Sequence, residues 1–123
     1  MDSRHNYFYP LRIRPGGRTV ALSEYGGIAW PMPGHEPPGK TYGYGTAKDK
    51  ADLTKRYKML QWKTILPQLG RGLSALVYTQ LTDVEDEVNG LFTYDRAALK
   101  PEAAAVRSCN AALAAEFAKA TAK

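Results

Sequence analysis

Leu22-Ser23-Glu24-Tyr25-Gly26-Gly27 is the stretch in which a predicted strand gives way to a glycine turn. The strand covers residues 19–23, which are rich in strand-forming side chains and mostly apolar, as expected of a parallel strand covered on both faces. The two glycines then release the backbone into a long loop. Glu24 therefore stands where a buried strand opens toward solvent, a position at which α/β folds carry catalytic groups. The plainer alternative is a surface carboxylate that ends an ordinary strand.

Strand and helix patterns alternate outward from this stretch. Residues 1–18 contain turn-forming Pro and Gly and predict an irregular approach segment. A helix is predicted from about residue 49 to residue 69, a second strand over residues 73–81 and a final helix over residues 101–117, with residues 119–123 as a tail. This β-α-β-α order within residues 19–118 predicts a right-handed βαβ unit with parallel strands, whose C-terminal ends share one edge.

The first predicted helix and the loop before it hold most of the aromatic candidates. Asp49 or Asp52 can cap the start of the helix, and the helical spacing predicts that Trp62 is a core residue. The connection over residues 28–48 is longer than usual for a compact domain. It contains Trp30 and His35, which favours an ordered, functional loop.

Charge and composition exclude several functional classes. The chain of 123 residues fits one domain, and its formal charge of +5 is spread without a basic arm, so we expect no nucleic-acid partner. The cluster Asp83-Val84-Glu85-Asp86-Glu87 also argues against a uniform polyanion-binding surface. A small basic nucleic-acid binder remains an alternative that rests on net charge alone.

Cofactor, membrane and targeting signals are also missing from the sequence. Cys109 is the only cysteine and lies in an alanine-rich helical pattern, which predicts a small packed side chain. His5 and His35 have no companion at metal-ligand spacing, so we expect no metal and no cofactor. No apolar run approaches the ~20 residues that span a bilayer, and the N-terminus lacks a signal-peptide pattern. We expect no membrane partner, and the default expectation is a cytoplasmic location.

Two blocks of sequence together resemble a known enzyme family. The first is the Leu22 to Gly27 stretch, and the second runs from Tyr78 to Arg96 as YTQLTDVEDEVNGLFTYDR. They are similar to the C-terminal end of the catalytic barrel of family 2 glycoside hydrolases, which include β-galactosidases, β-glucuronidases and β-mannosidases. The resemblance, over residues 18–112, implies an α/β fold that is part of a (β/α)8 (TIM) barrel. The predicted strands and helices would be strands and helices seven and eight.

The resemblance implies that Glu24 is the nucleophile of a retaining β-glycosidase acting on a β-linked sugar. In this reaction a second carboxyl, about 5–5.5 Å away, first protonates the leaving group and then activates water. The family's acid/base glutamate follows an asparagine, and no Asn-Glu pair occurs in this sequence. We therefore expect a fragment that is inactive alone and needs the remainder of the barrel or another copy of the chain. A non-catalytic carbohydrate- or protein-interaction module derived from that barrel is the alternative.

The resemblance also implies substrate contacts, for which plainer roles stay open. Tyr78 can form a platform under the sugar or pack in the core, and Thr79 and Gln80 can bond sugar hydroxyls. Asp83 can contact substrate or cap backbone amides, and Trp30 can shape the site rim or pack within its loop. The relatives that bind uronates carry a lysine near the position of Asn89-Gly90, and its absence here disfavours a uronate. Open sheet edges would further make the isolated chain marginally stable and prone to associate.

Overall fold

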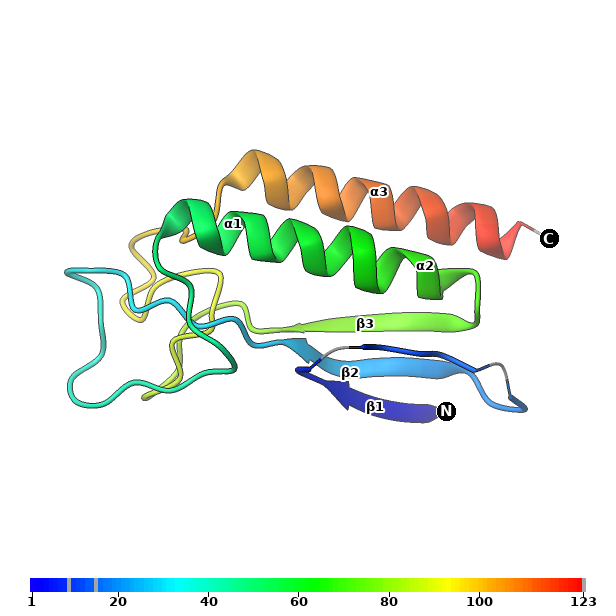
Figure 1. Ribbon diagram of the computed structural model, residues 1–123, viewed down its shortest axis with the longest axis horizontal. Coiled ribbons are helices and arrows are strands. Elements are labelled where there is room, and N and C mark those ends of the chain that lie inside the picture. The colour runs from blue at the N-terminus through cyan, green and yellow to red at the C-terminus, as the bar shows by residue number, and fades with distance from the viewer. Residues whose placement is uncertain (9, 15, 123) are drawn as a thin grey trace.

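The computed structural model describes residues 1–8, 10–14 and 16–122. Three parallel strands form one sheet in the order β1-β2-β3, and two helical rods lie side by side over one face of that sheet (Figure 1). The strands are β1 Asp2–Asn6, β2 Val20–Gly26 and β3 Leu73–Thr79. One rod is α1 Lys50–Met59, the π-helical η1 Leu60–Ile65 and α2 Leu66–Leu69, and the other is α3 Ala103–Thr121. Long loops gather at the C-terminal end of the sheet.

The prediction of a barrel segment made of strands and helices seven and eight was wrong. Residues 2–6, which we expected to be irregular, form β1 and pair in parallel with β2. The sheet therefore has three strands, with β2 at its centre, and it is covered by helices on one face as a small open α/β fold. The sequence of β1, Asp-Ser-Arg-His-Asn, has no apolar residue. Its backbone ladder holds it at an edge, where polar side chains are tolerated.

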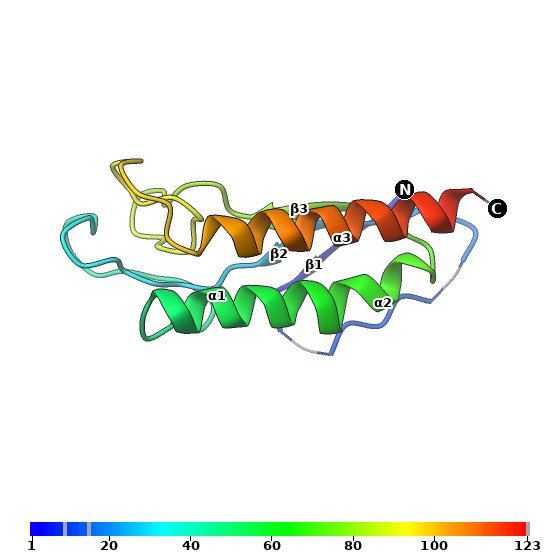
Figure 2. The same cartoon turned by 90° about the horizontal axis from the view of Figure 1, so that it is seen from above.

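Parallel neighbouring strands need a crossover connection. Here the described residues between β1 and β2, which are 7–8, 10–14 and 16–19, form an irregular connection that we call the strap. Figure 2 shows its described residues running back along the side of the α1–α2 rod. Ile13 fastens the strap: its side chain is 2% exposed, and its backbone N–H donates a hydrogen bond of 3.0 Å to Oε1 of Gln68 in α2. The strap thus buries an apolar anchor under the helices, although its described residues form neither helix nor strand.

The core lies between the sheet and the two rods. Its central strand contributes Val20, Leu22 and Tyr25, and the helices contribute Leu53, Leu60, Ile65, Leu69 and Leu113. Cys109 is fully buried, as predicted.

The prediction that Trp62 is a core residue was wrong, because its side chain is 43% exposed. The π-helical segment η1 lies at this point, and a π-turn fits more residues into each turn and so rotates the stripe that follows. Gln61 takes the inward position and is fully buried, with Oε1 accepting a hydrogen bond of 3.2 Å from the Tyr25 hydroxyl.

The start of α1 is capped by Asp49, which settles the alternative between Asp49 and Asp52. The Asp49 carboxylate accepts a hydrogen bond of 2.8 Å from the backbone N–H of Asp52. The Asp52 carboxylate in turn accepts one of 3.0 Å from the backbone of Lys48. Two backbone donors at this end are thus bonded by side chains, in a reciprocal arrangement related to the capping box.

Candidate functional site

Glu24 lies near the C-terminal end of the central strand and is half exposed. Its Oε2 accepts a hydrogen bond from the Tyr7 hydroxyl and lies 3.3 Å from Nδ1 of His5. Both partners come from the end of β1 and the residue that follows it. The strand that the sequence did not predict therefore builds one wall around the predicted nucleophile.

Tyr7 is the residue that sequence reasoning missed. Its ring stacks on that of Tyr44, with centroids 3.8 Å apart and planes 9° from parallel, and its hydroxyl lies 3.4 Å from Oγ1 of Thr79. Burial and the hydrogen bond to Glu24 raise the pKa of Tyr7 to about 12. Tyr7 is therefore a neutral hydrogen-bond donor beside Glu24 over the physiological pH range. The only signal in the sequence was an aromatic patch just before Pro10.

Two glycines allow the rings to approach the strand end. Gly26 and Gly27 have φ angles of 103° and 66°, which favour glycine. A Cβ on Gly27 would lie 2.6 Å from Cδ2 of Tyr44 and 2.8 Å from Cδ1 of Tyr7. A Cβ on Gly26 would overlap the ring of Tyr78. The Gly-Gly pair after Tyr25 is thus a packing requirement of the site as well as a turn.

Four aromatic side chains form a cluster beside Glu24: Tyr7, Phe8, Tyr42 and Tyr44. Phe8 and Tyr42 contact the Tyr44 ring edge-on, at centroid distances of 6.1 Å and 5.5 Å. Phe8 is 72% exposed and Tyr42 is 49% exposed. The pKa of Tyr44 is raised by the hydrogen bond with Tyr42, by burial, and by nearby charges that include Glu87 and Glu24. The aromatic cluster therefore lies within electrostatic range of two carboxylates.

Thr79 and Gln80 lie at the same end of the sheet as Glu24. Thr79 reaches Tyr7 as described, and Gln80 donates through Nε2 to Oε2 of Glu87 at 3.1 Å and to Oδ1 of Asn89 at 2.8 Å. Their predicted sugar contacts stay predictions.

Tyr78 is partly buried and packs against the core. Its ring contacts Tyr25 and Tyr57 edge-on, with centroids 5.5 Å and 5.3 Å apart. Of the two roles left open for this residue, the observed contacts favour the packing role.

Asp83 and Trp30 belong to a buried scaffold under the loops. Lys100 is fully buried, and its Nζ donates to Oδ1 of Asp83 at 2.7 Å, to the Trp30 carbonyl at 3.0 Å and to the Val88 carbonyl at 2.9 Å. Oδ1 of Asp83 also accepts from the Gly90 amide at 2.8 Å. Burial raises the pKa of Asp83 and lowers that of Lys100, against their mutual attraction. The contacts described for these two predicted residues hold three loop segments together beneath the site.

A side-chain contact between His35 and Asp95 joins the loop after β2 to the loop before α3. Nδ1 of His35 lies 2.7 Å from Oδ2 of Asp95, and Oδ1 of Asp95 accepts hydrogen bonds from Thr93 and the Ala97 amide at 2.6 Å and 3.0 Å. The bonds from Thr93, Ala97 and His35 hold the pKa of Asp95 far below its usual range. These contacts tie the loop after Glu24, through His35, to the segment around Asp95.

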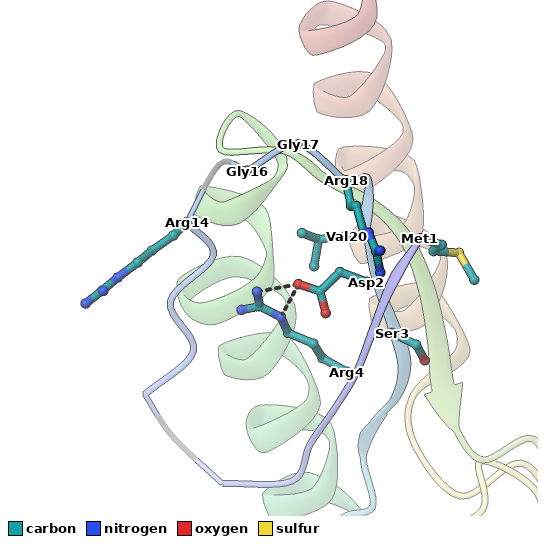
Figure 3. Close-up of a pocket in the computed structure, with 9 residues that line it drawn as sticks. All are labelled: Met1, Asp2, Ser3, Arg4, Arg14, Gly16, Gly17, Arg18 and Val20. Atoms are coloured by element: carbon teal, nitrogen blue, oxygen red, sulfur yellow. Dashed lines mark hydrogen bonds and ion pairs between the residues drawn. The ribbon is translucent and has the colours of Figure 1, made fainter.

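A cavity of about 450 Å³ lies at the opposite end of the sheet, where β1 and β2 begin. Figure 3 shows Arg4 turned toward Asp2, with hydrogen bonds of 3.0 Å and 2.6 Å, and Arg14 extended away from both. Glu24 does not line this cavity. Its polar side chains are thus separate from the Glu24 site.

Metal-binding and membrane-spanning features were sought over the described ranges 1–8, 10–14 and 16–122. There, no three or more His, Cys, Asp and Glu side chains come together as a metal site. Within the same ranges, every helix falls short of the length and apolar character needed to cross a membrane.

Comparisons with known proteins add no relative. No protein-family model matches the chain, and no curated protein sequence matches it. The resemblance to family 2 glycoside hydrolases therefore rests on the two sequence blocks quoted above, and what it implies for activity is a proposal.

Proposed function

We propose that Glu24 is the nucleophile of a retaining β-glycosidase site and that this chain supplies one of its two carboxylates. The observation that carries the proposal is the setting of Glu24: a half-exposed carboxylate at a central strand end, with one oxygen held by the neutral hydroxyl of Tyr7. This hydrogen bond fixes the orientation of the carboxylate. Within residues 1–8, 10–14 and 16–122, both described contacts of Glu24 are made by Oε2, and none is made by Oε1. A fixed, accessible carboxylate is what attack on an anomeric carbon requires.

The reaction divides into two displacements. The Glu24 carboxylate forms a bond to the anomeric carbon while the glycosidic C–O bond breaks, and the leaving oxygen takes a proton from a second carboxyl group. Water then attacks the same carbon, gives its proton to that second group and releases Glu24. The Asn-Glu pair that carries the acid in the resembled family is absent from this sequence, so we assign the acid to another polypeptide.

Because the proposed acid lies outside this chain, the test needs a substrate that can be cleaved without an acid catalyst. A dinitrophenyl 2-deoxy-2-fluoro-β-glycoside has a leaving group that departs without protonation, so it tests the first displacement alone. We expect intact mass spectrometry of the full chain to show one added glycosyl group, mapped to Glu24 by peptide sequencing. Galacto, gluco and manno forms would rank the preferred neutral sugar.

Two variants control this labelling experiment. Glu24→Gln should abolish the adduct, whereas Glu116→Gln, which changes a partly exposed carboxylate on α3, should leave it unchanged. Equal labelling of wild type and Glu24→Gln would refute the nucleophile assignment. Unassisted hydrolysis of ordinary aryl glycosides should be absent from all three proteins.

Carbohydrate binding without hydrolysis is the second candidate, and the exposed aromatic cluster favours it. Flat aromatic faces stack on the apolar faces of sugars, and such rings are amphipathic anchors. Tyr44→Ala should then weaken binding of neutral oligosaccharides, while Tyr94→Ala, at a position that is 45% exposed, should not. Binding that survives Glu24→Gln, together with no labelling of wild type, would favour this module over the enzyme.

A further inference from the structure

The outer side of the α1–η1 rod carries a groove that the Glu24 site does not use. Its volume is about 620 Å³, and an apolar floor is surrounded by positive charge. We call this surface the basic groove; its main residues are Met59, Trp62, Lys50, Lys55, Lys58 and Lys63. Met59 and Trp62 are each 43% exposed, and Nζ of Lys58 lies 5.2 Å from the centre of the Trp62 ring. A large apolar surface with a charged rim is typical of a protein-binding site.

The charge of the basic groove selects the kind of partner. Its four lysines face one carboxylate, Glu102, which pairs with Lys50 at 3.3 Å. The other three lysines have no carboxylate within ion-pair distance among the mapped residues. A segment that combines acidic and aliphatic side chains would match both the rim and the floor of this surface.

The same chain presents such a segment on its loops. We call it the acidic turn; it comprises Leu81, Val84, Glu85 and Asp86. Leu81 is 66% exposed and Val84 is 47% exposed, and the carboxylates of Glu85 and Asp86 are exposed beside them. The turn is tied to its own loops through the bond from the Tyr42 amide to the Asp86 carbonyl, at 2.7 Å.

We propose that the basic groove of one copy of this chain binds the acidic turn of a second copy. Leu81 and Val84 cover the floor formed by Met59 and Trp62, while Glu85 and Asp86 meet the lysine rim. We place this contact head-to-tail, so that a bound pair still offers a free turn on one copy and a free groove on the other. Assembly therefore extends beyond a dimer.

Sedimentation velocity on the full chain over a concentration series tests this proposal. Wild type should form species larger than dimers, and added salt should weaken them because it screens charge. Lys55→Glu/Lys63→Glu and Glu85→Lys/Asp86→Lys should each weaken self-association by at least about tenfold through like-charge contacts. Circular dichroism and thermal melting should match wild type, since all four side chains are exposed. Trp62→Ala should weaken assembly at high salt as well.

Mixing the two charge-reversed variants gives the sharpest readout. Each variant retains one intact surface, and the two reversed surfaces carry opposite charges, so the mixture should associate where neither variant does alone. Arg107→Glu/Lys119→Glu, with the same charge change on exposed positions of α3, should assemble like wild type.

Three results would overturn the proposal. A wild-type chain that stays monomeric at all concentrations would do so, as would assembly that neither reversal alters. If only the groove reversal acts and the mixture does not pair, the groove binds an acidic segment other than the acidic turn, and association between copies through these two surfaces is refuted.

Discussion

The Tyr7 hydroxyl donates a hydrogen bond to Oε2 of Glu24, and so joins the segment after β1 to the central strand β2. The phenol loses this donor role when it ionises, and the two negative charges would then repel each other. Folding and the pKa of Tyr7 are therefore linked, because burial and Glu24 favour the neutral phenol in the folded state.

Replacing Tyr7 by Phe should remove a tyrosine titration near pH 12, since the pKa of Tyr7 rises from 10.0 to about 12 on folding. A raised pKa means that the stabilisation is complete below pH 10 and is lost as pH increases from 10 to 12. Denaturant unfolding monitored at a series of pH values should show wild type losing its advantage over Tyr7→Phe in this window. Tyrosinate absorbance follows the titration directly. Tyr94→Phe is the matched control and should leave that titration in place.

Replacing Lys100 by Met should destabilise the fold by about 3–5 kcal/mol, because the buried Asp83 carboxylate loses its counter-charge. Urea unfolding measures the cost. The double variant Lys100→Met/Asp83→Asn should recover part of it, since no buried charge remains. Lys50→Met breaks an exposed pair with Glu102 and should cost only about 0–1 kcal/mol. Equal costs at the two lysines would contradict a buried scaffold.

Replacing Gly27 by Ala should cost about 1–3 kcal/mol, through the positive φ angle and the contact of the new methyl group with Tyr44 and Tyr7. The Tyr7–Tyr44 stack should loosen, which near-ultraviolet circular dichroism would detect. Gly16→Ala is the control, because a Cβ there has no heavy atom within 4 Å. We expect it to change the free energy of unfolding by less than about 0.5 kcal/mol.

Replacing Asp49 by Ala should destabilise α1 by roughly 1 kcal/mol through loss of the N-cap bond to Asp52. Asp49→Asn keeps an oxygen acceptor and should cost less. Thermal melts of the two variants give the comparison, and a larger loss with Asn than with Ala would exclude capping as the cause.

Local patterns predicted part of the fold. The alternation of strand and helix was enough to predict that residues near 20 and 73 pair in parallel, as Val20 and Leu73 do. Capping chemistry restricted the start of α1 to Asp49 or Asp52. The barrel segment failed because β1 lacks an apolar pattern and is recognised only by its backbone ladder with β2. Trp62 was misplaced because the π-helical turn altered the helical phase.

The candidate site, like the fold, was predicted only in part. Glu24 was predictable because it ends a local strand pattern, and the structure places it at that strand end. Tyr7 and His5 reach Glu24 only through β1, so the missed strand also concealed both partners. For Asp83 the sequence left open a substrate contact or a bond to backbone amides, and the structure shows the bond from the Gly90 amide. Nothing in the sequence near Asp83 indicates that Lys100 is buried beside it.

The central strand β2 pairs with β1, which is close in sequence, and with β3, which is far away in sequence. The two pairings can therefore form at different times during synthesis. Val20 pairs with Asp2 on one side, so Tyr7 and Glu24 can meet while only the first part of the chain has emerged from the ribosome. On the other side Val20 pairs with Leu73, which is made much later. The Thr79 contact of Tyr7 must therefore form last. A nascent chain that stops before β3 would hold Glu24 and Tyr7 together with one side of the candidate site still open.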